Sequence, residues 1–156
     1  MAGANTVRKS SKLSHIDALM QAYYDRVAEL YEEHQFLTHE DRRFVQSFVS
    51  ECRENKINQL YDFGCGTCKT TLLFVNEGFT VEATDISERM IAIARQKYAH
   101  PKLTIHNASF ERLLDRLPVT EQSEKVAAVF FYSLIHLPHE RCEQILASLA
   151  KKLVPG

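Results

Sequence analysis

The sequence predicts an α/β fold, in which an open and mostly parallel sheet carries helices on both faces. Segments with the composition of buried strands alternate with segments of helical periodicity four times. A glycine-rich turn follows the first of these strands, and an acid follows the second. The last strand, residues 126–132, is a continuous apolar run without alternation, which suits a parallel sheet buried on both faces. Right-handed crossovers would then give the doubly wound strand order 3-2-1-4.

The bulk composition predicts one globular domain. A chain of 156 residues with 45% hydrophobic and 25% charged residues is long enough to bury a core. We expect residues 1–13 to be a flexible tail and residues 14–156 to form the domain, with N-terminal helices at 14–54 and the α/β core at 57–156. A net charge of -1 gives no reason to expect nucleic-acid binding.

Membrane insertion and secretion are not expected either. The chain has no apolar run of the roughly 18 residues that a membrane helix needs, and its start lacks the apolar core of a signal peptide. Four cysteines in such a chain indicate reduced thiols in a cytoplasmic protein.

Two helices are predicted ahead of the first strand. Residues 14–31 carry apolar side chains at helical spacing, which indicates an amphipathic helix. Thr38, three residues before Asp41, resembles a capping box that opens a second helix running to about Cys52.

The core elements follow in alternation. Ser87 is a suitable N-cap for the helix after the second strand, and Pro138 fits the first turn of the last helix. The predicted strands are 57–63, 79–84, 103–106 and 126–132. The predicted helices are one directly after the glycine-rich turn, 88–98, 110–117 and 138–153, with a polar surface loop at 120–125.

The turn GCGTC after the first strand permits several interpretations. Dinucleotide binding requires G-x-G-x-x-G, but Lys69 stands where the third glycine would be, and the phosphate-loop pattern also lacks its glycine before Lys69. The string from Cys65 to Cys68 is alternatively a C-x-x-C redox pair at a helix start, where a thiol pKa is lowered. A zinc site is disfavoured because Cys52 and Cys142 are isolated on predicted helices, so no metal ligands are assigned.

A third interpretation covers more of the chain. YDFGCGTC, with Asp62, Gly64 and Gly66, resembles the first motif of the class I S-adenosylmethionine-dependent methyltransferases, and VEATDIS, with Asp85, resembles their second. SERMIAIARQKY, FYSLIHLP and KKLVPG are similar to later signatures of that family, and YDRVAELYEEH resembles the N-terminal helix of one subgroup. The resemblance implies a Rossmann-like fold and S-adenosylmethionine as cofactor, with S-adenosylhomocysteine as product.

The resemblance also implies a set of site residues. Asp62 would contact the cofactor's amino group directly or through water. Asp85 would accept hydrogen bonds from the two ribose hydroxyls, and the amide oxygen of Asn107 would accept one from the adenine amine. His136 is the candidate general base, and Tyr132 is grouped with it as catalytic. The residues expected to bind the cofactor are Tyr24, Tyr31, Asp62, Gly64, Cys65, Gly66, Asp85, Ile86, Met90, Asn107, Ala108, Ser109, Phe110 and Phe131.

The sequence departs from the family at four places. Asn107 stands where the family usually has an acid, and Lys125 and Val126 stand where the fourth strand often begins with one. The other two departures are Cys68 and the end of the chain. Cys68 replaces the third glycine of the first motif; because a helical position does not demand positive φ, we expect a tighter but usable pocket. Family members continue past the L-x-P-G turn with a fifth strand and a hairpin, so the chain is expected to be truncated after the fourth strand. Otherwise it would cover that exposed edge by forming a homodimer.

The resemblance thus implies methyl transfer to an unidentified acceptor, expected to be a small molecule. One alternative is a non-catalytic module or truncated fragment that binds S-adenosylmethionine or S-adenosylhomocysteine without methylating anything. The C-x-x-C redox protein is the other. Titration with S-adenosylmethionine and S-adenosylhomocysteine distinguishes the methyltransferase from the non-catalytic module, and the thiol pKa of Cys65 tests the redox interpretation.

Overall fold

The structure is a computed structural model that describes residues 14–118 and 125–153. The predicted tail at 1–13, residues 120–124 of the predicted loop and the closing turn at 154–156 lie outside the described residues.

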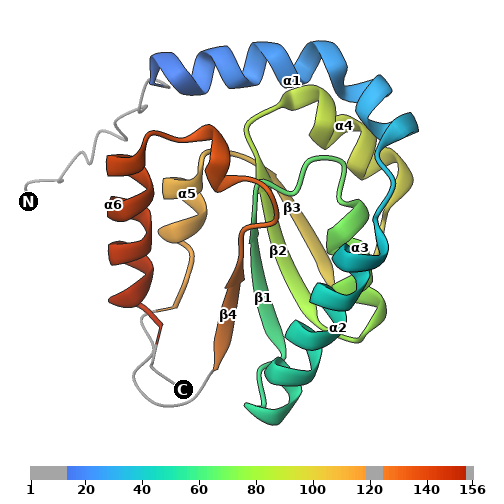
Figure 1. Cartoon of the computed structure of the whole chain (residues 1–156), viewed down its shortest axis with the longest axis vertical. Coiled ribbons are helices and arrows are strands. Elements are labelled where there is room, and N and C mark those ends of the chain that lie inside the picture. Colours follow the sequence, from blue (N-terminus) through green and yellow to red (C-terminus); the bar gives the residue numbers. More distant parts are fainter. Residues whose placement is uncertain (1–13, 119–124, 154–156) are drawn as a thin grey trace, which may run out of the picture.

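The four predicted strands are present and form one parallel sheet in the order β3-β2-β1-β4, which confirms the predicted order. β1 is central because β2 and β4 flank it on either side (Figure 1). The strands are β1 Gln59–Phe63, β2 Thr80–Asp85, β3 Leu103–Asn107 and β4 Val126–Val129.

Helices cover both faces of the sheet (Figure 1). Those ahead of β1 are α1 His15–His34 and α2 His39–Glu54; the others are α3 Lys69–Asn76, α4 Glu88–Lys97, α5 Phe110–Leu114 and α6 His139–Ala150, with a short 3-10 helix, η1, at Leu134–His136. The predicted caps are confirmed. Thr38 and Asp41 form a capping box at α2, and the Ser87 hydroxyl accepts from the Met90 N–H at 3.1 Å. Ser14 and Asp17 form a second box, at α1.

The two faces of β1 divide the core. Leu60 faces a cluster built from α2, α3 and α4, which includes Val49, Phe74 and Ala94. The next residue, Tyr61, points to the opposite face, because successive strand side chains alternate. It packs there, with Phe63, against the leucines of α5 and the apolar residues of α6.

Three predicted boundaries are wrong. The last strand ends at Val129 and not at Tyr132, because the chain turns away where Tyr132 takes a φ of 58°. Its middle residues, Ala127 and Ala128, are only half-buried, so the strand is not buried on both faces throughout. The helix at 110–117 is the shorter α5, followed by a turn, and α6 ends at Ala150 rather than at residue 153.

The helix α1 lies across the carboxyl ends of the strands and over α4 (Figure 1). Ala28 of α1 packs against Met90 and Ile93 of α4, with Tyr24 and Tyr31 at the margin of the contact. In an open parallel sheet, ligands bind beyond the carboxyl ends of the strands, so α1 covers the place where a site is expected. Within the described ranges, no helix is long and apolar enough to cross a membrane.

Candidate functional site

A cavity lies between α1 and the carboxyl ends of the strands. Together with its open mouth it occupies about 700 Å³. Its walls come from α1, the glycine turn, the end of β2, the start of α5 and the segment between β4 and α6. The lining residues are Asp17, Met20, Tyr24, Tyr31, Gly64, Gly66, Asp85, Ile86, Met90, Phe110, Phe131, Tyr132, Ser133, His136, Leu137 and Arg141.

The glycine turn approaches this cavity with its backbone. The Gly64 and Cys65 amides donate to the Thr84 carbonyl at 2.8 and 2.9 Å, which ties the turn to the end of β2. Gly64 has a φ of +85°, and a Cβ there would lie 2.4 Å from the Cβ of Ser133. Only glycine therefore fits at position 64, for both conformation and space.

Asp85 connects the turn to the next helix. Its Oδ2 accepts from the Gly66 amide at 3.0 Å and its Oδ1 from the Ser87 amide at 2.9 Å. Burial raises the pKa of the Asp85 carboxyl, and the amides of Ser87 and Gly66 partly oppose that rise. A carboxylate oxygen can accept more than one hydrogen bond, so Asp85 keeps acceptor capacity facing the cavity.

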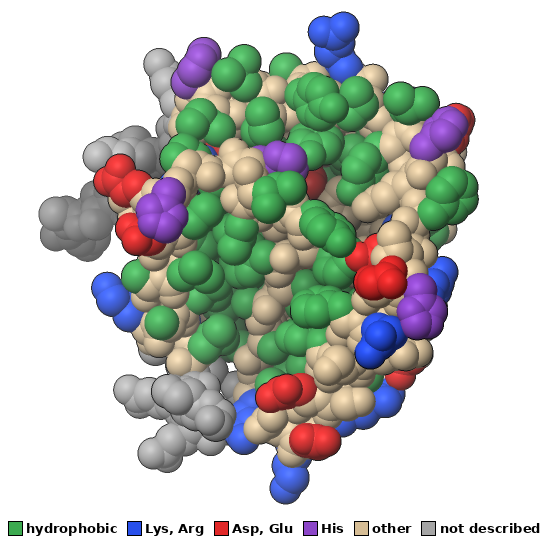
Figure 2. Space-filling view, viewed as in Figure 1, with side chains coloured by type: hydrophobic (Ala, Val, Ile, Leu, Met, Phe, Trp, Pro, Cys, Tyr) green, Lys and Arg blue, Asp and Glu red, His purple; other side chains and the backbone are tan. Residues whose placement is uncertain are grey.

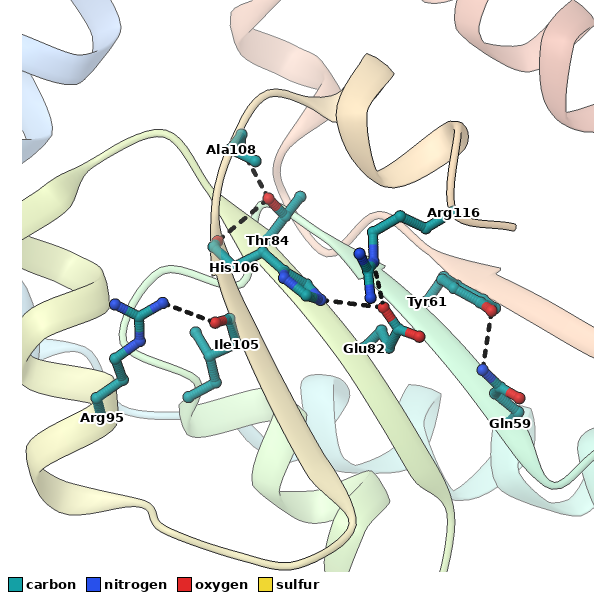
Figure 3. Close-up of polar contacts among 9 residues, drawn as sticks. All are labelled: Gln59, Tyr61, Glu82, Thr84, Arg95, Ile105, His106, Ala108 and Arg116. Atoms are coloured by element: carbon teal, nitrogen blue, oxygen red, sulfur yellow. Dashed lines mark hydrogen bonds and ion pairs between the residues drawn. The ribbon is translucent and has the colours of Figure 1, made fainter. Parts of the chain in front are cut away.

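The end of β3 and the segment after it are held against the end of β2 (Figure 3). The Thr84 hydroxyl is directed at the carbonyls of His106 and Ala108, at 3.2 and 2.8 Å. The Asn107 amide nitrogen donates to the carbonyls of Asp85 and Ile86. This orientation leaves the Asn107 oxygen available as an acceptor, and its role toward the adenine amine stays a prediction. However, Asn107, Ala108 and Ser109 do not line the cavity.

A tyrosine and a histidine meet across the cavity. The Tyr24 hydroxyl lies 2.7 Å from Nε2 of His136. Burial, with smaller contributions from Tyr23 and Asp85, raises the pKa of Tyr24, so the phenol keeps its proton. The Tyr24 hydroxyl can therefore donate to Nε2, the direction that applies when the His136 ring carries its proton on Nδ1. Tyr31 packs edge-on to Tyr24, and burial raises its pKa to about 12.

Tyr132 lines the cavity, but its hydroxyl is engaged elsewhere. That hydroxyl donates to Oδ1 of Asp41 at 2.9 Å and so fastens the segment after β4 to the start of α2. The side chain is 60% exposed. The hydroxyl is thus directed toward α2.

Asp62 is buried behind the glycine turn and does not line the cavity. Its Oδ2 accepts from the Thr71 hydroxyl at 2.6 Å, and its Oδ1 has no partner among the described residues. Burial raises the pKa of this carboxyl to about 6, although the Thr71 hydrogen bond opposes the rise. A buried carboxylate oxygen without a donor is unfavourable unless a water or a ligand satisfies it.

Lys69 does not face the cavity. Its ammonium group donates to the carbonyls of Glu32 and Gln35 at the end of α1. The lysine on which the phosphate-loop interpretation relies is thus bound to α1, which argues against a phosphate cradle at this turn.

The two cysteines of the turn differ from an activated redox pair. A hydrogen bond with Cys68, followed by burial, raises the pKa of the Cys65 thiol well above its usual value. The predicted helical conformation of Cys68 is wrong, because this residue has a φ of +66° as the N-cap of α3. A left-handed conformation at a residue with a Cβ is unfavourable by about 1–2 kcal/mol. Neither cysteine lines the cavity.

The cavity therefore unites eleven of the sixteen residues that the sequence singled out. Five lie outside its lining: Asp62, Cys65, Asn107, Ala108 and Ser109. Five lining residues were missed: Asp17, Met20, Ser133, Leu137 and Arg141. Asp17 had a local signal, since it follows Ser14 by three residues and closes the capping box of α1. Arg141, whose Nη1 donates to Oδ1 of Asp17 at 2.6 Å, had no such signal in the sequence.

Comparison with known proteins gives the family. A family model described as "Methyltransferase domain" matches residues 60–156. A protein of Geobacillus sp. (strain WCH70) that is named as a methyltransferase is 36% identical over 62 residues, which are 40% of this chain and 25% of that protein. Glycine N-methyltransferase of Rattus norvegicus is 27% identical over 116 residues, 67% of this chain and 39% of that enzyme. The chain thus spans well under half the length of these curated relatives.

Solved structures agree in fold. Magnesium protoporphyrin IX methyltransferase (ChlM) from Synechocystis PCC 6803, crystallised with bound SAM, has a TM-score of 0.64 and 17% identity over 92% of this chain and 74% of that one. DhpI, in a complex with SAH, has a TM-score of 0.61 and 22% identity over 92% and 67%. The family model covers more than half of the chain and includes the glycine turn, Asp85 and His136; this chain belongs to the methyltransferase-domain family.

Proposed function

We propose that this chain binds S-adenosylmethionine in the cavity beneath α1 and transfers its methyl group to a small-molecule acceptor. One observation carries the proposal: the Gly64 turn, the Asp85 carboxylate and the Tyr24–His136 pair all face the same cavity. Two structural relatives, one with bound SAM and one in a complex with SAH, support this choice of cofactor.

The residues present fit this cofactor. Asp85 has acceptor capacity for the ribose hydroxyls, and Gly64 leaves the space that a Cβ would fill. S-adenosylmethionine carries no phosphate, which agrees with a turn whose lysine is bound elsewhere. Its sulfonium is cationic, and the aromatic rings of Tyr24 and Tyr31 offer the faces that favour a cation. We retain Asp62, Cys65, Asn107, Ala108 and Ser109 as neighbours of the cofactor at a greater distance, with Asp62 acting through water.

When bound, the cofactor supplies a methyl group already activated by the positive charge on sulfur. The chain then has to align the acceptor and take up its proton. We propose that an acceptor hydroxyl or amine donates to the Tyr24 oxygen and that the Tyr24 proton moves to Nε2 of His136. His136 is thus the final base. Tyr132 holds the cavity wall after β4 in place, because its hydroxyl donates to Asp41.

Calorimetric titration with S-adenosylmethionine and S-adenosylhomocysteine tests the proposal. We expect both to bind the unaltered chain, and Asp85→Ala to weaken binding at least about tenfold through the loss of charge-assisted hydrogen bonds. Glu54→Ala is the matched control, since Glu54 is an exposed acid at the end of α2. Absence of binding to the unaltered chain would refute the proposal. Binding without S-adenosylhomocysteine production from any small-molecule pool would instead indicate a non-catalytic module.

We further propose that two copies associate through the outer edge of β4, which in the described ranges pairs with β1 alone. Figure 2 shows hydrophobic side chains gathered over the centre of this face. Phe44, Phe130 and Ile135 line a groove beside β4. Light scattering at several concentrations tests this, and a monomer at all of them would refute it. We also propose a cytoplasmic location, as the four cysteines of a sequence without secretory features suggest.

A further inference from the structure

The turn from Cys65 to Cys68 brings two thiols together. The Cys68 amide donates to the Cys65 carbonyl at 2.8 Å, which is the hydrogen bond of a β-turn. Such a turn keeps the Cα atoms of its first and fourth residues within about 7 Å, and disulfides span Cα separations of about 4.4–6.8 Å. Both cysteines are free, and the Cys65 thiol is directed along the turn toward the Gly66 carbonyl, 3.7 Å away. A disulfide would therefore need little movement of the backbone.

We propose that Cys65 and Cys68 are the site of a reversible disulfide in the turn behind the cavity, formed by exchange with a small disulfide such as oxidised glutathione. Cys65 is half-buried and Cys68 fully buried, so Cys65 reacts first. Its thiolate attacks the external disulfide, forms a mixed disulfide and releases one glutathione thiol. Cys68 then attacks the Cys65 sulfur and releases the second. The protein loses two protons and two electrons, and one external disulfide becomes two thiols.

The bond would fix the turn in the shape that it already has. Cys68 holds a left-handed φ of +66°, and a cross-link to Cys65 retains that conformation. Gly64 and Gly66, on either side of Cys65, line the cavity, whereas neither cysteine does. The disulfide therefore lies behind the cavity wall, and we expect it to stabilise the turn without filling the cavity.

This pair differs from a thioredoxin-like site in its rate of reaction. Its neighbours Cys68, Asp62 and Asp85 disfavour a thiolate at Cys65, as does burial. The first exchange step should therefore be slow at neutral pH. It should accelerate by about tenfold per pH unit while the thiol is mainly protonated.

Peptide mapping of the folded, full-length chain tests the proposal. The protein is equilibrated with oxidised and reduced glutathione at alkaline pH, quenched with acid, alkylated and digested with trypsin. Cleavage after Lys56 and Lys69 releases peptide 57–69, which contains Cys65 and Cys68 and neither of the other two cysteines. We expect this peptide to be lighter than its reduced, unalkylated form by two hydrogen atoms.

A synthetic peptide of residues 57–69 is the control for chain flexibility. We expect the folded protein to form the disulfide with an equilibrium constant about tenfold or more above that of the peptide, because the fold holds the two residues together. Because the disulfide forms more readily in the folded chain than in a flexible one, it should stabilise the folded state to the same extent. Oxidation should therefore raise the thermal midpoint by about 4 °C. Equal constants in protein and peptide, or a peptide that carries glutathione on Cys65 without the internal bond, would overturn the proposal. Cys68→Ser should stop at the mixed disulfide.

Discussion

Gly64→Ala tests the close approach between the glycine turn and the segment after β4. The added Cβ would lie 2.4 Å from the Cβ of Ser133, where contacts of at least 3.4 Å are ordinary. About 1 Å of movement is then needed between two backbones, which typically costs about 1–3 kcal/mol in a packed site. The φ of +85° adds about 1–2 kcal/mol for any residue with a Cβ. We expect a loss of about 2–5 kcal/mol in the free energy of unfolding.

Gly78→Ala provides the matched control. Gly78 has a similar φ of +97°, but nothing lies within 4 Å of the position that a Cβ would take there. Gly78→Ala should therefore lower the free energy of unfolding by the conformational cost alone, about 1–2 kcal/mol. Urea unfolding, followed by circular dichroism, measures both variants, and the difference between them isolates the contact with Ser133. If Gly64→Ala were no more destabilising than Gly78→Ala, the inferred contact between the turn and Ser133 would be refuted. Ser133→Gly in the Gly64→Ala background should recover part of the loss.

Three further predictions concern single side chains. The pKa of Asp62 rises from 3.8 to about 6 on folding, which corresponds to about 3 kcal/mol. A carboxyl whose pKa is raised on folding stabilises the fold at low pH, and this contribution is lost as pH rises from about 4 to about 6.5. Over that range, urea titrations should show the free energy of unfolding of the wild type falling by most of this 3 kcal/mol relative to that of Asp62→Asn. A difference between the two proteins that does not change with pH would contradict this. Tyr24→Phe removes the hydroxyl on His136 but keeps the ring; we expect kcat to fall about 100-fold with cofactor affinity within threefold by calorimetry, and an unchanged kcat would exclude the relay. Lys56, at φ 60°, occupies the position after the α2 C-cap that favours glycine; Lys56→Gly should raise the thermal midpoint by about 2–4 °C, whereas Lys56→Ala, which keeps the strain, should not.

Features that depend on local chain chemistry could be predicted from the sequence. The strand order followed from alternation of strand and helix patterns, and the N-cap roles of Thr38 and Ser87 followed from residue type and spacing. Gly64 and Asp85 were placed at strand ends, which in a parallel sheet share one edge, and both line the cavity.

Contacts between distant segments could not be predicted. Tyr24 and His136 are 112 residues apart, and Asp17 and Arg141 are 124 apart, so no local pattern relates them. Tyr132 leaves the strand direction with a φ of 58° and donates to Asp41 in α2, a contact that the run of apolar residues does not encode. The left-handed conformation of Cys68 was missed for a different reason: residue type made it improbable there.

The helix α1 that covers the cavity is attached mainly by polar contacts. Of its twenty residues only Asp17, Ala28 and Glu32 are buried, and Ala28 is the apolar one. Several polar contacts join α1 to other parts of the chain, among them Asp17 to Arg141, Asp25 to Ser87, Glu29 to Arg89 and Glu32 to Lys97. Of these ion pairs, Glu29–Arg89 is exposed at both partners, whereas Asp17 and Glu32 are buried. An exposed ion pair contributes about 0.2–1 kcal/mol and is weakened by salt, while buried pairs are screened much less.

We therefore expect α1 to open as a unit at a lower free energy than global unfolding, and so to expose the cavity. Native-state hydrogen exchange should show the amides of α1 exchanging through an opening several kcal/mol easier than that of β1. Raising the salt to about 1 M should lower this opening energy by up to about 1 kcal/mol, since the exposed Glu29–Arg89 pair is the one that salt screens most. The amides of β1 and β2, buried in the apolar core, serve as the internal control and should respond little. If α1 exchanged only at the global unfolding energy, with no response to salt, apolar packing of Ala28, Tyr24 and Tyr31 on α4 would have to be the main attachment, and cofactor entry would require another route.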